Sequence, residues 1–165
     1  MAAVQIFSRE PGAARVPQPV AGVIAGLVAG AAYLFAQVSL TALATPGGAA
    51  EPLQRIAAIL MGPDAAPPPA ELNFTVLGMA LIIHFGLAMV FGRLVCALVW
   101  QRAAPRAVLL GALTGVALFV VNFMLLAPLA FPWFADSARG VTVLDHALFG
   151  AIAASTCVLL RPRRS

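Results

Sequence analysis

The chain has 165 residues and a net charge of +4, and 62% of its residues are hydrophobic whereas only 10% are charged. Its mean hydropathy is +0.98, and a globular domain averages about 45–50% apolar and about 25% charged residues. Because so few polar groups cannot cover a surface that faces water, this composition excludes soluble enzymes, nucleic-acid-binding proteins and disordered proteins. It predicts an all-α membrane protein whose first partner is the lipid bilayer.

Four stretches of the chain are apolar and long enough to cross a bilayer, which takes about 20 residues of helix. A polar tail at residues 1–19 precedes them, and an Arg-rich tail at residues 161–165 follows them. The short links between the later stretches favour antiparallel neighbours, so the sequence predicts a four-transmembrane-helix bundle. The predicted spans are residues 20–43, 72–100, 107–130 and 141–160.

A shorter helix is predicted at residues 51–61, inside the Pro-rich and Gly-rich connector between the first two spans. Glu51 stands four residues before Arg55, an arrangement that favours a helical ion pair. The segment is too short to cross a bilayer, so we expect an amphipathic helix at the outer membrane interface, with Leu53 and Gln54 in opposite environments. Its apolar stripe at helical spacing consists of Leu53, Ile56, Ala57 and Leu60. A stiff Pro-rich segment at residues 67–69 follows.

The arginines predict the orientation of the chain. Seven of them lie in the two tails and in the link between the second and third spans, against two in the other connections. Because positively charged loops stay in the cytoplasm, we expect a multi-pass protein of a bacterial inner (plasma) membrane with both termini in the cytoplasm. Cys96 and Cys157 then lie toward the cytoplasmic, reducing side, so the sequence predicts small packing residues and neither a disulfide nor a zinc site.

Small residues recur on one face of each predicted span, and each of these faces also carries polar side chains. In the first span, for example, Gly22, Gly26 and Gly30 share a face with Tyr33. Small faces let membrane helices approach one another, and polar groups avoid lipid, so both are expected to point into the bundle. The polar positions all fall in the outer half of their spans, which predicts one internal polar layer. Its residues are Tyr33, Gln37, His84, Asn122, Asp145 and His146.

Two explanations of this layer stay open: it fixes the positions of the helices through hydrogen bonds, or it contains a functional site at His84. Interhelical hydrogen bonds, each worth about 0.6–2 kcal/mol, would account for Tyr33, Gln37 and Asn122. His84 lies close to the bilayer centre, where ionisable residues are rare and mark functional sites. Pro128 lies near the outer end of the third span, and we expect it to interrupt the backbone hydrogen bonds of that helix.

The chain lacks the phosphate-binding, metalloprotease and nucleophile-elbow motifs, so no enzymatic activity is predicted. The leading interpretation is an accessory or structural membrane protein that works with another membrane protein or with a second copy of itself. One alternative is a proton or small-solute pathway along His84 and Asn122. The other is a redox subunit in which His84 and His146 are the axial ligands of haem b.

Four segments in the C-terminal half resemble a known family. They are HFGLAMVFG in the second span, GALTGVALFVVNF in the third, the loop FPWFADSAR, and DHALFG in the fourth. In this order they resemble the YagU-like family of small bacterial inner-membrane proteins, with His84, Pro132, Trp133 and His146 at the matching positions. The pair Asp145-His146 stands where that family has Gly-His. The resemblance implies no enzymatic activity and a role connected with stress such as acid exposure.

Overall fold

The computed structural model describes residues 16–44, 48–66, 72–134 and 139–162. The described part consists of helices and short connections and has no strand, which confirms the predicted fold class. Most of both predicted tails and the Pro-rich segment at residues 67–69 lie outside the described residues. The helices are α1 (Gln18–Ala44), α2 (Ala50–Met61), α3 (Phe74–Val99), α4 (Ala104–Phe119), α5 (Ala127–Ala130) and α6 (Arg139–Leu160), with the short elements η1 (Pro63–Ala65), η2 (Val120–Leu126) and η3 (Pro132–Phe134).

Four helical segments are long and apolar enough to cross a membrane. They are α1, α3, the continuous run from α4 through η2 to α5, and α6, and their mean hydropathy lies between 1.8 and 2.3. Large apolar side chains such as Phe35, Ile82 and Leu144 are mostly exposed on the outside of the bundle. An apolar exterior over helices of this length suits lipid and not water. The chain is therefore built as a multi-pass membrane protein.

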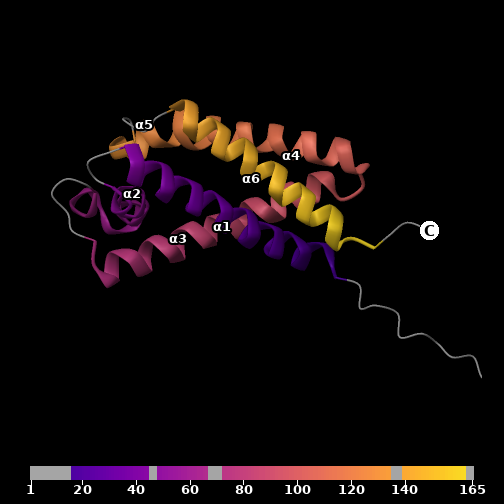
Figure 1. The fold of residues 1–165 in the computed structure, drawn as a ribbon, viewed down its shortest axis with the longest axis horizontal. Helices are drawn as coiled ribbons and strands as arrows, with labels where there is room; N and C mark the ends of the chain where they lie inside the picture. The colour runs from indigo at the N-terminus through magenta and orange to yellow at the C-terminus, as the bar shows by residue number, and fades with distance from the viewer. Residues whose placement is uncertain (1–15, 45–47, 67–71, 135–138, 163–165) are drawn as a thin grey trace, which may run out of the picture.

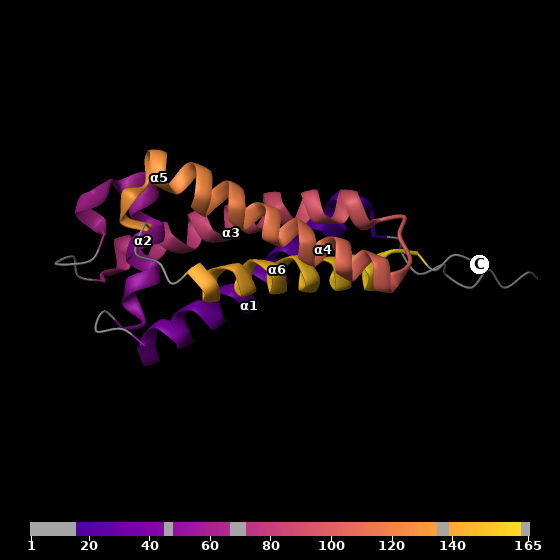
Figure 2. The ribbon, with the colours of Figure 1, turned by 90° about the horizontal axis from the view of Figure 1, so that it is seen from above.

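The four long helices form two pairs, α1 with α3 and α4 with α6, and the pairs meet where α1 packs on α6. Helices α3 and α4 contact each other little, although a link of only a few residues joins them. The beginning of α1 and the end of α6 lie at one end of the bundle (Figure 1). Helix α2 runs across the opposite end (Figure 2).

Glycines allow both pairs of helices to touch through their backbones. A Cβ atom on Gly26 would overlap the Ala88 carbonyl, and one on Gly92 would overlap the Gly26 backbone. In the second pair, Gly111 and Gly150 lie against each other in the same way. Small residues permit this approach in membranes, where hydrophobicity alone does not drive helices together. The faces on which small residues were predicted to recur are therefore the surfaces through which the helices of the bundle contact one another.

A disulfide joins Cys96 of α3 to Cys157 of α6, so the prediction of two unpaired thiols is wrong. The two Cα atoms are 5.7 Å apart, which is within the normal range for a disulfide. Both side chains are fully buried, as expected of small packing residues. The prediction rested on the redox state of the compartment and could not take the distance between the two helices into account.

Pro128 lies just after a π-helical stretch, η2, in the third span. Proline has no backbone N–H, and its ring clashes with the carbonyl four residues earlier, so an α-helix cannot continue regularly through it. Here the Ala127 N–H bonds to the Asn122 carbonyl, five residues back. The predicted interruption is therefore a wide π turn. It leaves Asn122 inside an irregular segment, and π turns are frequent at functional sites.

Helix α2 is present as predicted, and Arg55 forms its ion pair with Glu51 at 2.7 Å. The expected contrast between Leu53 and Gln54 is wrong, because both are buried, at 8% and 3% exposure. Leu60, which belongs to the predicted apolar stripe, is 69% exposed. The reason is that α2 packs on α3 and on the end of α1. The face of α2 that these contacts bury includes Gln54 and excludes Leu60, so it differs from the predicted apolar stripe.

Candidate functional site

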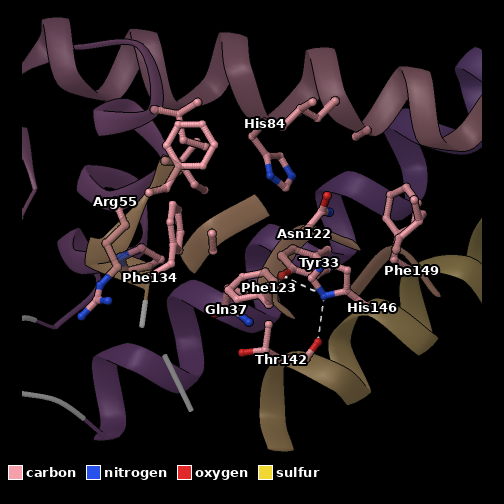
Figure 3. Close-up of a pocket in the computed structure, with 18 of the residues that line it drawn as sticks. Tyr33, Gln37, Arg55, His84, Asn122, Phe123, Phe134, Thr142, His146 and Phe149 are labelled. Atoms are coloured by element: carbon pink, nitrogen blue, oxygen red, sulfur yellow. Dashed lines mark hydrogen bonds between the residues drawn. The ribbon is translucent and has the colours of Figure 1, made fainter. Parts of the chain in front are cut away.

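A cavity of about 680 Å³ lies in the half of the bundle next to α2 (Figure 3). Its lining residues come from α1, α2, α3, α6 and the run from α4 to η3. Helices α3 and α4, which both line the cavity, contact each other little, whereas the glycine contacts hold each of them close to its own partner helix. Cavities of this size commonly bind small molecules.

Five of the six residues of the predicted polar layer line this cavity: Tyr33, Gln37, His84, Asn122 and His146. The sixth, Asp145, is buried behind the cavity wall. The Gln37 side-chain amide donates a hydrogen bond to the Asp145 carboxylate, which ties α1 to α6. The structure thus brings the six residues together, although they come from four helices.

The hydrogen bond of His84 determines which of its ring nitrogens is left for another partner. Its Nε2 lies 2.9 Å from the Gly30 carbonyl oxygen. Because a carbonyl only accepts, Nε2 carries the hydrogen, and in a neutral imidazole Nδ1 is then an acceptor. Gly30 has no side chain that would keep the ring away from its carbonyl, and its missing Cβ lies 3.5 Å from Nε2.

His146 has the opposite arrangement. Its Nδ1 lies 2.8 Å from the Thr142 carbonyl oxygen, so Nδ1 carries the hydrogen and Nε2 is the acceptor of the neutral ring. The Tyr33 hydroxyl lies 3.3 Å from the same Nδ1. Around the ring, the aromatic side chains of Tyr33, Phe119 and Phe123 make edge-on contacts with centroid distances of 5.1–5.8 Å.

Three polar groups keep hydrogen-bonding capacity for a molecule in the cavity. In the part of the chain that the structure describes, no hydrogen bond engages His84 Nδ1, His146 Nε2 or the Asn122 side-chain amide. Every fully enclosed side-chain nitrogen and oxygen of the described residues does have a partner. The three groups must therefore reach open space, and the cavity is the space that these residues line. In Figure 3 His84 and Asn122 point toward each other.

The remaining walls of the cavity are mostly apolar and aromatic. Phe123 and Phe134 line the cavity and meet edge-on, and Phe123 is stacked on the buried Phe119 with their centroids 5.6 Å apart and their planes at 12°. Phe91 and Phe149 line the cavity as well. An apolar cavity with a few convergent polar groups is the usual form of a small-molecule site.

Two residues that the sequence analysis did not assign to the site hold α2 across its end. Arg55 donates from its guanidinium to the Trp133 carbonyl, and the Trp133 indole N–H donates to the Arg55 carbonyl at 3.1 Å. Arg55 and Glu51 also line the cavity. The two partners are 78 residues apart, so no local pattern could reveal the pair.

The two histidines do not fit an axial pair for haem in this arrangement. A histidine usually binds haem iron through Nε2, and His84 Nε2 is bonded to Gly30, so this ring has only Nδ1 left, the nitrogen beside the bond to Cβ and therefore the more crowded one. The Tyr33 ring contacts both imidazoles, at centroid distances of 5.9 and 5.1 Å, and fills the space beside them. Within the described ranges, no group of three His, Cys, Asp or Glu residues could hold a metal ion.

Among the residues that the structure describes, the cavity does not continue along the bundle as a polar path. Toward the termini the core consists of closely packed apolar side chains, among them Val95, Val99 and Ala153, together with the disulfide. An ion or a polar solute would have to cross this region without polar partners, which is costly. The geometry is that of a site closed at one end.

Comparisons with family models, with characterised proteins and with solved structures give no significant match to this chain. Its function is therefore inferred from the geometry of the cavity and its polar groups.

Proposed function

We propose that this protein is an accessory membrane protein that binds a small, lipid-soluble molecule in the cavity beneath α2. One observation carries the proposal: an apolar cavity of about 680 Å³ is lined by polar atoms from three helices that have no hydrogen-bond partner in the described chain. These atoms are His84 Nδ1, His146 Nε2 and the side-chain amide of Asn122. The bond of His84 to Gly30 links α3 to α1, and fixing the helix register would need no further hydrogen-bonding capacity on that ring. His84, Asn122 and His146 instead keep capacity for a ligand.

The bilayer is the source of the ligand in this proposal. Helices α3 and α4 border the cavity and contact each other little, so its open side lies between two helices that face lipid. Leu87 and Val121 line the cavity and are also exposed on these helices. A molecule dissolved in the bilayer can enter there without crossing water.

The orientation of the chain belongs to the same proposal. The excess of arginines at the end that carries the termini favours a cytoplasmic location for that end in a bacterial inner membrane. The cavity and α2 then lie in the outer half of the membrane. The YagU-like resemblance is compatible with an accessory role, because His84 and His146 line the cavity and Trp133 holds α2 across it.

Filling the cavity from one wall tests the proposal. Val121 is an exposed residue that lines the cavity, and Leu113 is an exposed residue on α4 that does not. We expect naphthalene to raise the unfolding temperature of the wild-type protein and of Leu113→Trp in detergent, but not that of Val121→Trp, because a ligand stabilises only a protein that can bind it. Equal shifts in all three proteins, or no shift in any of them, would refute binding in this cavity.

A further inference from the structure

We infer that the ligand of this cavity is the headgroup of a membrane quinol, a neutral aromatic ring that carries two hydroxyl groups and a lipid-soluble tail. This inference rests on the proposed function and adds the chemical class of the ligand. Three features of the cavity point to this class of ligand. Its polar groups are mainly acceptors, the charged residues in its lining are paired, and its walls are rich in aromatic rings.

The free nitrogens of both imidazoles are hydrogen-bond acceptors, so a matching ligand must carry hydrogen-bond donors. The carbonyls of Gly30 and Thr142 fix the hydrogens on His84 Nε2 and His146 Nδ1, so each neutral imidazole offers only a lone pair. A hydroxyl group can donate to such a nitrogen, whereas the carbonyl of a quinone cannot. The Asn122 amide can donate as well as accept, so it suits an oxygen that does both. Two acceptors on different helices match two hydroxyl groups on one ring.

The charged groups near the cavity either lie outside its lining or are paired with each other. Asp145 lies outside the lining and accepts from Gln37. At the α2 end, Arg55 pairs with Glu51 and with the Trp133 carbonyl. A charged headgroup would thus meet no unpaired opposite charge among the described residues that line the cavity, and it would lose its hydration on entry. A neutral headgroup avoids this cost.

The walls suit a flat ring. Tyr33 and Phe123, which line the cavity, already make edge-on contacts with the His146 imidazole, and this is a favourable geometry between aromatic rings. Phe91 and Phe149 offer further aromatic surface in the same space. The open side between α3 and α4 leaves an isoprenoid tail in the bilayer, so the whole molecule need not fit inside.

Three related probes test the class of ligand. A benzoquinol with one isoprenyl unit has two donors, its O,O-dimethyl ether has none, and the corresponding quinone has acceptors only. We expect the wild-type protein, titrated anaerobically in detergent, to bind the quinol roughly tenfold or more tightly than the other two, because they leave the imidazoles without a donor. Equal affinity for the three probes would overturn the inference.

Two variants assign the preference to the named groups. Asn122→Leu removes an amide that has no partner in the described chain, so the fold should tolerate it, and His84→Phe removes one imidazole. We expect each to lower the preference for the quinol several-fold, whereas Thr114→Val, on α4 outside the cavity, should leave it unchanged. A full preference in both cavity variants would contradict the assignment.

The failure of this inference and that of the proposed function give different results. If only the ligand class is wrong, all three probes bind equally and Val121→Trp abolishes their binding. If the proposed function is wrong, none of the probes binds, or all of them bind Val121→Trp as tightly as the wild-type protein.

Discussion

The two pairs of helices depend on glycines at their contacts, and two glycines of α3 allow this to be tested within one helix. Gly92 packs on α1, where a Cβ atom would overlap the Gly26 backbone. Around Gly86, by contrast, a Cβ atom would meet nothing within 4 Å. The same change to alanine should therefore have opposite effects at the two positions.

At Gly92 the overlap is with backbone atoms, which cannot rotate away, so α1 and α3 must move apart. Overpacking of this kind costs about 1–3 kcal/mol. At Gly86 only the helix propensity changes, which favours alanine by at most about 1 kcal/mol. We expect Gly92→Ala to be less stable than the wild-type protein by about 1–2 kcal/mol, and Gly86→Ala to be equally or slightly more stable.

Unfolding in mixed micelles with increasing SDS, followed by circular dichroism, measures these differences. A Gly92→Ala protein as stable as the wild type would refute the close contact of α1 and α3. A Gly86→Ala protein destabilised by the same amount would show that the loss has nothing to do with that contact.

Three further predictions follow from the ends of the bundle. Cys96→Ser should remove the disulfide to Cys157 and change the mobility of the protein on a non-reducing gel. Because the bridge closes a segment of 61 residues, the variant should also be less stable by up to about 4 kcal/mol, and unchanged stability would argue against the bridge. Arg55→Ala should speed hydrogen exchange in α2 but not in α6, and equal protection in both proteins would contradict the contact with Trp133. Reporter fusions after Ser165 should give a cytoplasmic signal, and a periplasmic one would reverse the proposed orientation.

Much of the fold follows from the sequence because the bilayer restricts the choice of structure. Every span must satisfy its backbone within itself, so hydropathy alone predicts four helices. The faces were also predictable, since Gly22, Gly26 and Gly30 repeat at helical spacing and lie against α3. Tyr33 continues that face, and the same reasoning placed it in the bundle interior.

The cavity could not be predicted in the same way. It depends on how little α3 and α4 contact each other, which has no local pattern in the sequence. It also depends on the π turn that contains Asn122; Pro128 predicts an interruption of the third span but not the form that it takes. Helix α2 was predicted from its periodicity, but the face it buries depends on α3. The burial of Gln54 is an example: the residue is polar and lies outside the apolar stripe, yet tertiary contacts enclose it.

The central claim is that the bundle holds a small molecule in the cavity beneath α2. Native mass spectrometry of protein extracted from its membrane in mild detergent tests it most directly, with Val121→Trp and Leu113→Trp alongside. We expect a bound neutral molecule on the wild-type protein and on Leu113→Trp, and none on Val121→Trp. A wild-type protein that keeps phospholipid on its outer surface but carries no such molecule, or a Val121→Trp protein that still carries it, would contradict the claim.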